Sequence, residues 1–172
     1  MNIMQEVLNN EAYMIEERRY LHRHPEPSAQ EWKTIEHLHQ ELLRMGIAHD
    51  VVEDGGILAY IDGAKPGKTV LLRADCDALK MPEQPNNLKG PKVCVSENEG
   101  VCHSCGHDGH SATLLTVGKV LNEHKDELCG NVRLFFQPGE EVCLGAKAVI
   151  AAGGMEGVDA AFMIHNGTMN PV

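Results

Sequence analysis

Aromatic side chains, long apolar runs and excess positive charge are all scarce in this sequence of 172 residues. Phe, Trp and Tyr together make up 4% of the chain, so aliphatic side chains must supply most of any core. No apolar run approaches the roughly 18 residues that a membrane-spanning helix needs, and the first residues lack the apolar centre of a signal peptide. We therefore expect a protein with no membrane partner that stays in the cytoplasm.

A basic surface is also absent. The chain carries 25 acidic and 15 basic side chains, which gives a formal net charge of −10. Because binding to nucleic acid requires a basic face, we do not expect nucleic acid as a partner. The six cysteines are expected to be free thiols or metal ligands, since disulfides are rare in the cytoplasm. The apolar share of 42% is typical of a globular protein.

Two amphipathic helices are expected at the start of the chain, from about residue 9 to 22 and from about residue 28 to 46. The second shows a start signal, with Ser28 as N-cap and Glu31 completing a capping box. Apolar residues then recur at helical spacing, beginning with Trp32, and should face inward.

Five short apolar runs indicate strands, and two helical patterns separate the later ones. The runs are "AHDVVE", "GILAYID", "TVLLRAD", "NVRLFFQP" and "VDAAFMIH". The fourth has a continuous apolar centre, as expected of a strand that is covered on both faces. Strands that alternate with helices predict an α/β fold with a partly parallel sheet.

The segment "GVCHSCGHDGH", residues 100–110, is the densest group of metal-binding residue types in the chain. Imidazole nitrogen and thiolate sulfur are good ligands for zinc-like ions. The intervening glycines let the backbone bend so that neighbouring side chains can converge. The candidates within it are Cys105, His107, Asp108 and His110.

The pair Cys102 and Cys105 allows other interpretations. Covalent haem attachment would require histidine where Gly106 stands. A structural zinc knuckle would need a second matched pair, and a redox pair would follow a strand rather than a long polar loop. We expect Cys105 to be the functional thiol, and Cys102 and His103 to be bystanders. Three other cysteines are expected to be small side chains of the core, namely Cys94, Cys129 and Cys143.

Three further groups follow predicted strands. Asp75 and Asp77 alternate along a strand and so share a face. Glu140 and Glu141 follow a strand and a Pro-Gly turn, and His165 ends the last strand. Each has an ordinary explanation alone: a solvated pair, a surface pair and a core histidine. Because α/β sheets bind ligands at the carboxyl ends of their strands, the groups together indicate one metal site.

These motifs, in their order along the chain, resemble a known family. The matching segments are "RRYLHRHPEPSAQE", "LLRADCDAL", "GVCHSCGHDGHSATLL", "GNVRLFFQPGEE" and "GAKAVIAAGGMEGVDAAFMIH". They are similar to the metal-dependent amidohydrolases that include hippurate hydrolase, N-acyl-amino-acid deacylases and auxin-conjugate hydrolases, within the aminoacylase and carboxypeptidase clan. The resemblance implies a three-layer, zinc-peptidase-like α/β catalytic domain with a mixed, mostly parallel sheet.

The resemblance also implies a site with two divalent metal ions. Its ligands here would be Cys105, His107, Glu141 and His165. Glu140 would be the general base, and Asp77 would orient a metal-binding imidazole, with Asp75 as the fallback. His110 would have a supporting or packing role. Manganese or zinc is expected first, with nickel and cobalt as the other candidates.

The implied reaction is hydrolysis of the amide bond of an N-acyl amino acid, a small-molecule substrate, by metal-activated water. Members of the family are considerably longer than this chain. Residues 1–172 are therefore expected to be the N-terminal portion of the catalytic domain, without the lid or dimerisation domain and the C-terminal portion. The alternative function is a non-catalytic metal-binding or interaction fragment. The incomplete sheet edge is expected to favour self-association.

Overall fold

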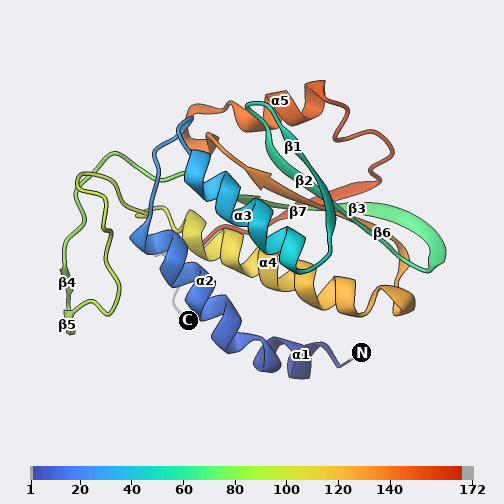
Figure 1. The fold of residues 1–172 in the computed structure, drawn as a ribbon, viewed down its shortest axis with the longest axis horizontal. Coiled ribbons are helices and arrows are strands. Elements are labelled where there is room, and N and C mark those ends of the chain that lie inside the picture. Colours follow the sequence, from blue (N-terminus) through green and yellow to red (C-terminus); the bar gives the residue numbers. More distant parts are fainter. Residues whose placement is uncertain (1, 168–172) are drawn as a thin grey trace.

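A computed structural model describes residues 2–167 as a layered α/β unit around a five-stranded sheet (Figure 1). The sheet strands are β1 (Ala48–Val52), β2 (Gly56–Asp62), β3 (Lys65–Asp75), β6 (Cys129–Gln137) and β7 (Ala160–Met163). The helices are α1 (Ile3–Asn9), α2 (Glu11–Arg23), α3 (Trp32–Arg44), α4 (His107–Glu123) and α5 (Gly145–Ala151). Short 3-10 turns are η1 (Lys125–Glu127) and η2 (Glu140–Val142), and β4 (Asn86–Asn87) pairs with β5 (Gly90–Pro91) in a projecting loop.

The sheet has the strand order β1-β2-β6-β3-β7 and confirms the predicted mixed α/β class. Strands β6, β3 and β7 are parallel to one another, whereas β1 and β2 are added in antiparallel fashion. Parallel and antiparallel pairings are thus equally represented, rather than mostly parallel. The parallel half brings the carboxyl ends of β3, β6 and β7 to the same edge of the sheet.

Helices cover both faces of the sheet, which gives the three expected layers. On one face, Leu38 and Leu42 of α3 join Leu115 of α4 in a cluster with Leu134 and Phe136 of β6, all fully buried. Burying each such side chain stabilises the fold by about 2 kcal/mol.

The opposite face of the sheet is covered by α5 (Figure 1). There Phe135 packs with Leu58, Leu71 and Val149 in a second cluster. The run predicted to be covered on both faces is therefore the central strand β6, and the prediction for it is confirmed.

The start of α3 differs from the sequence-based prediction. The helix begins at Trp32, and no capping box forms between Ser28 and Glu31. Instead the carboxylate of Glu26 accepts a hydrogen bond of 2.7 Å from the backbone N–H of Thr34, an early residue of the helix. Trp32 is 73% exposed rather than inward-facing. A more distant carboxylate thus replaces the local capping signal.

Other expectations are also corrected. The first predicted helix corresponds to α2, and the preceding short helix α1 was not predicted. Cys94 is buried as expected, but Cys129 and Cys143 are exposed and are not core side chains. Strand β7 forms an edge of the sheet, and its apolar residues are exposed, Phe162 by 61%. These residues are exposed because no further element of the described residues covers this edge.

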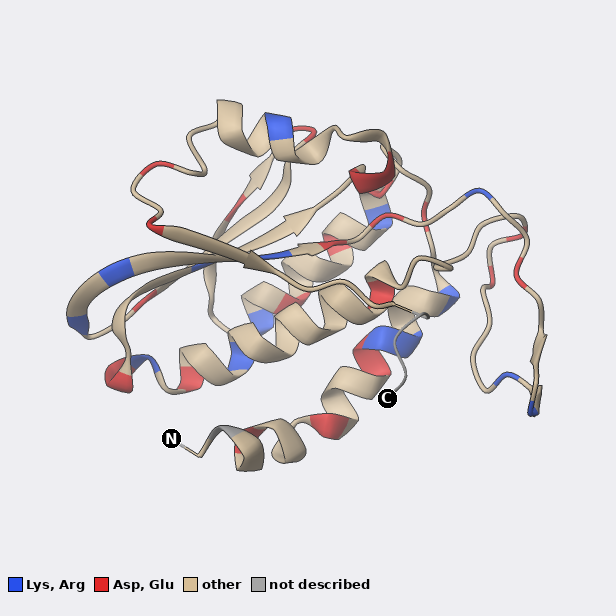
Figure 2. Cartoon of the chain, turned by 180° about the vertical axis from the view of Figure 1, so that it is seen from behind, with Lys and Arg blue, Asp and Glu red and all other residues tan. Residues whose placement is uncertain are grey.

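Acidic residues (red) occur on helices, strands and loops with basic residues (blue) between them (Figure 2). No face of the described chain in this view gathers basic residues alone. Within residues 2–167, none of the helices is both long enough and apolar enough to cross a membrane.

Candidate metal centre

The sequence-predicted residues meet at the edge where β3, β6 and β7 end. Asp75 is the last residue of β3, and Asp77 follows in the next loop. The loop after β6 contributes η2 with its two glutamates, and His165 lies just beyond β7. Helix α4 begins at the same edge with His107. Parallel strands therefore assemble one site from segments that are far apart in the sequence.

His107 is the fully buried centre of this group. Its Nδ1 lies 3.0 Å from Oδ1 of Asp77, so the carboxylate holds the proton on that nitrogen. Its Nε2 is buried and has no hydrogen-bond partner among the described residues; it lies 3.8 Å from Oδ1 of Asp75 and 3.9 Å from Oε1 of Glu141. A buried ring nitrogen without a partner is costly unless a ligand completes it.

The electrostatics of this pair follow from the same contacts. Burial raises the pKa of Asp77, but the hydrogen bonds from His107, Ser28 and the backbone of Glu141 outweigh burial and lower it to about 2. Burial lowers the pKa of His107, but the contact with Asp77 and the neighbouring negative charges, led by Asp75, outweigh it and raise the value. The carboxylate is therefore ionised and fixed against the ring.

Cys105 and His165 complete one side of the group. Sγ of Cys105 lies 3.3 Å from Nε2 of His165, and one donor atom each of Cys105, His107 and His165 lies within 4.8 Å of the others. Burial and the contact with Glu141 raise the pKa of the Cys105 thiol to about 11. The thiol is thus protonated near neutral pH and would lose its proton on binding a metal ion.

The two glutamates form the other side. Gly139 precedes them with φ 58°, a left-handed conformation that glycine adopts easily. Donor atoms of His107, Glu140 and Glu141 again lie within 4.8 Å of one another. The backbone N–H of Glu141 donates to Asp77 at 3.1 Å, which ties the turn to the carboxylate that holds His107.

A second carboxylate–histidine pair lies beside the first. Nδ1 of His110 lies 2.6 Å from Oδ1 of Asp75, and Nε2 of His110 accepts a hydrogen bond of 2.9 Å from the backbone N–H of Asn166. Both ring nitrogens are therefore used. Arg73 forms an ion pair of 3.1 Å with the other oxygen of Asp75. Donor atoms of Asp75, His107 and His110 also lie within 4.8 Å of one another, but the hydrogen bonds of His110 occupy both of its ring nitrogens in this arrangement.

The donor set fits a divalent transition ion. A thiol, two imidazoles and two carboxylates form overlapping groups around the open nitrogen of His107. Imidazole and thiolate suit zinc, while carboxylates also suit manganese.

Comparisons with known proteins agree with this geometry. The model of peptidase family M20/M25/M40 matches residues 71–172. This chain belongs to peptidase family M20/M25/M40. The family resemblance expected from the motifs is confirmed.

Relatives of this M20 chain include hydrolases of N-acyl amino acids. The N-acetylcysteine deacetylase of Bacillus subtilis is 40% identical over 161 residues, which are 92% of this chain and 41% of the relative. The N-acyl-L-amino acid amidohydrolase of Geobacillus stearothermophilus is 39% identical over 150 residues, 86% of this chain and 39% of the relative. The chain thus spans about two fifths of the length of these relatives.

A solved structure shares the fold. It is a dinuclear metal binding peptidase from the M20 family of Bacillus subtilis, with a TM-score of 0.84 and 38% sequence identity. The match covers 94% of this chain and 44% of that chain.

Three residues that contact the site of the M20 chain are not among the predicted site residues. Ser28 donates to Asp77 at 2.7 Å, and the carboxylate of Glu31 accepts from the backbone N–H of Gly139 at 2.7 Å. Arg73 lies near Glu140, at 3.9 Å, as well as Asp75. Only Arg73 had a usable signal, because it stands two residues before Asp75 on the same face of a strand.

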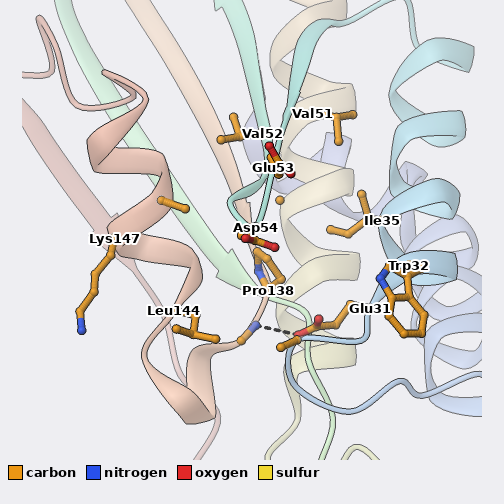
Figure 3. A pocket seen from close by; sticks show the side chains of 14 residues that line it. Glu31, Trp32, Ile35, Val51, Val52, Glu53, Asp54, Pro138, Leu144 and Lys147 are labelled. Atoms are coloured by element: carbon orange, nitrogen blue, oxygen red, sulfur yellow. Dashed lines mark hydrogen bonds between the residues drawn. The ribbon is translucent and has the colours of Figure 1, made fainter.

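A largely apolar cavity of about 690 Å³ is lined in part by Pro138 and Gly139, which precede the two glutamates in the chain (Figure 3). Trp32, Ile35, Val51 and Leu144 line it, and the bond from Gly139 to Glu31 crosses its lower part in the view. None of the candidate ligands is among its lining residues. The cavity is therefore separate from the metal centre.

Proposed function

We propose that this chain forms the metal-binding part of an M20 amidohydrolase that cleaves the amide bond of N-acyl amino acids. The observation that carries the proposal is the buried Nε2 of His107, which lacks a hydrogen-bond partner in the part of the chain that the structure describes and which Asp77 holds toward a thiol and carboxylates. The names of the relatives support the substrate class.

The proposed ligands of two divalent ions, manganese or zinc, are the predicted four residues: Cys105, His107, Glu141 and His165. Nickel and cobalt remain the other candidates. Each proposed ligand belongs to at least one of the overlapping donor groups. When bound, the ions would polarise the amide carbonyl and lower the pKa of the attacking water.

Glu140 is the proposed general base. It is not fully buried, and it belongs to the donor group with His107 and Glu141 without being held by a short contact: the ion pair with Arg73 measures 3.9 Å. A carboxylate so placed can take the proton of the attacking water and pass it to the leaving amine. Asp77 meanwhile keeps a proton at Nδ1 of His107, so that Nε2 presents its lone pair.

The neighbouring glutamates provide a matched test. Hydrolysis of hippurate and of N-acetyl amino acids is measured with added manganese or zinc for the chain, Glu140→Gln and Glu141→Gln. We expect Glu140→Gln to lose at least about 100-fold in kcat while it retains metal, and Glu141→Gln to lose metal affinity as well. Tight metal binding without any turnover by the unaltered chain would instead support the non-catalytic alternative.

The two cysteines of the CxxC pair provide a second matched test. Cys105→Ala should abolish metal uptake, whereas Cys102→Ala should not, because Cys102 is buried away from the described donor groups. Metal content after dialysis measures both. Equal loss in the two variants would revive the zinc-knuckle interpretation.

The cytoplasmic location and the association through the β7 edge stay predictions. Metal analysis of the purified chain, with and without a separately supplied C-terminal half of a relative, would test whether a further segment completes the site.

A further inference from the structure

His22, in the last turn of α2, lies between two carboxylates on opposite sides of its ring. Nδ1 is 2.7 Å from Oδ2 of Asp108, and Nε2 is 3.0 Å from Oε1 of Glu83. The side chain of His22 is 6% exposed, that of Asp108 is 2% exposed and that of Glu83 is 9% exposed. An ionised carboxylate only accepts hydrogen bonds, and a neutral imidazole carries a single N–H. Both contacts are satisfied only if the ring is an imidazolium.

Arg18 offers the competing arrangement. Its Nη2 lies 3.2 Å from Nδ1 of His22, so a neutral ring could accept from it, while Nε of Arg18 lies 2.9 Å from the same oxygen of Asp108. That arrangement would place a lone pair of Nδ1 2.7 Å from an anionic oxygen. The shorter contact therefore favours two cations, Arg18 and His22, that share Asp108.

The surrounding charges support the same state. The hydrogen bond to Asp108 raises the pKa of His22, against burial and against the charge of Arg18. Burial raises the pKa of Glu83, but its contacts with Lys92, the backbone of Ser96 and His22 lower it to about 2. The neighbouring ring of His103, 6.5 Å away between centroids, stays neutral because burial lowers its pKa to about 4.

The contacts of His22 join three separate segments. Glu83 belongs to the projecting loop, where it also accepts from Lys92 at 2.9 Å and from the backbone of Ser96 at 2.6 Å. Asp108 lies in the first turn of α4, directly after His107. His107 is held from the other side by Asp77, so the turn is fixed from two directions.

We propose that His22 is a positioning residue that, as an imidazolium, fastens the loop of residues 81–100 and helix α2 to the first turn of α4 and thereby orients His107. The role of His107 rests on the proposed function, but the state of His22 does not. Because the folded form holds the proton more tightly than the unfolded form, the clamp is fully formed below the ordinary histidine pKa of 6.5. It is lost as the pH rises through the raised value.

The protonation state is tested directly on the metal-free chain by ¹⁵N NMR of the histidine rings between pH 6 and 10. The signal that disappears in His22→Gln assigns His22. We expect two protonated nitrogens at pH 7.5, where an ordinary histidine is mostly neutral. A singly protonated ring with an ordinary titration would overturn the proposal.

The clamp is tested by trypsin cleavage after Lys92 and by zinc affinity in a chelator competition. In the unaltered chain, cleavage should be slow at pH 7 and accelerate as the clamp deprotonates. His22→Gln should be cleaved quickly throughout and should bind zinc about tenfold more weakly. The control His24→Gln removes a partly exposed neighbour that lies 3.8 Å from Glu97 of the same loop, and it should behave like the unaltered chain.

The outcomes separate the two proposals. Unchanged cleavage and zinc affinity in a folded His22→Gln would refute the clamp, whatever the hydrolysis assays give. An imidazolium with pH-dependent cleavage and weaker zinc binding in the variant would support it, even if no amide were hydrolysed.

Discussion

At the carboxyl end of β3, the pairs His107–Asp77 and His110–Asp75 are built alike. In each, an aspartate from the strand end contacts Nδ1 of a histidine on the first turns of α4, and all four residues are buried. They differ at the other nitrogen. Nε2 of His110 accepts a hydrogen bond from the backbone N–H of Asn166, whereas Nε2 of His107 has no hydrogen-bond partner within residues 2–167.

This difference teaches that a carboxylate–histidine contact does not by itself mark a metal ligand. The carboxylate orients the ring in both pairs. The contact of the second ring nitrogen, Nε2, then distinguishes the pairs. In a closed pair Nε2 already accepts a hydrogen bond, whereas in an open pair its lone pair can bind a metal ion. For His110, the hydrogen bond from the backbone N–H of Asn166, just after β7, closes the pair.

Replacing each histidine by alanine should give the largest difference between the two pairs. His107→Ala should lower zinc affinity by more than about 100-fold, beyond the loss typical of a supporting residue. His110→Ala should retain zinc but lower the free energy of unfolding by about 3 kcal/mol, because Asp75 loses a buried partner. Chelator competition and urea unfolding measure the two effects. Equal zinc loss in both variants would show that the pairs are not different.

Neutralising each carboxylate should give the next largest contrast. Asp77→Asn should weaken zinc binding by about 10- to 100-fold, since the ring loses the acceptor that holds its proton. Asp75→Asn should change zinc affinity much less, because Nε2 of its partner His110 already accepts a hydrogen bond from Asn166. The same competition assay applies, and a larger zinc effect for Asp75→Asn would reverse the assignment.

Opening the closed pair should give the smallest effect. Asn166→Pro removes the backbone N–H that donates a hydrogen bond to Nε2 of His110. The free energy of unfolding should therefore fall by about 1 kcal/mol. Asn166→Ala keeps this N–H and is the control. Thermal unfolding of the metal-free chain compares them. Equal stability of the two variants would mean that the backbone contact does not close the pair.

Much of the fold could be predicted from local pattern. The apolar centre of β6 is continuous, as expected of a strand covered on both faces. Asp75 and Asp77 both contact histidines of α4, but only Asp75 lies on a strand, so the predicted alternation along one strand is wrong for Asp77. The local pattern wrongly predicted a capping box between Ser28 and Glu31. Both side chains bind the site loops instead, at Asp77 and Gly139, and such distant partners leave no trace in local spacing.

The exposed β7 edge shows the same limit. The run "VDAAFMIH" has the composition of a buried strand, yet its burial depends on what packs beside it. In the described residues, β7 pairs only with β3.

The sequence by itself determined the family, the α/β class and the residue types of the candidate metal centre, because dense motifs and apolar periodicity are local properties of the chain. The tertiary structure alone decided that the ring of His107 stays open while that of His110 is closed. It also decided that His22 lies between two carboxylates. These outcomes depend on which donors and acceptors meet across distances of many residues, and only packing of the strands and helices brings them together.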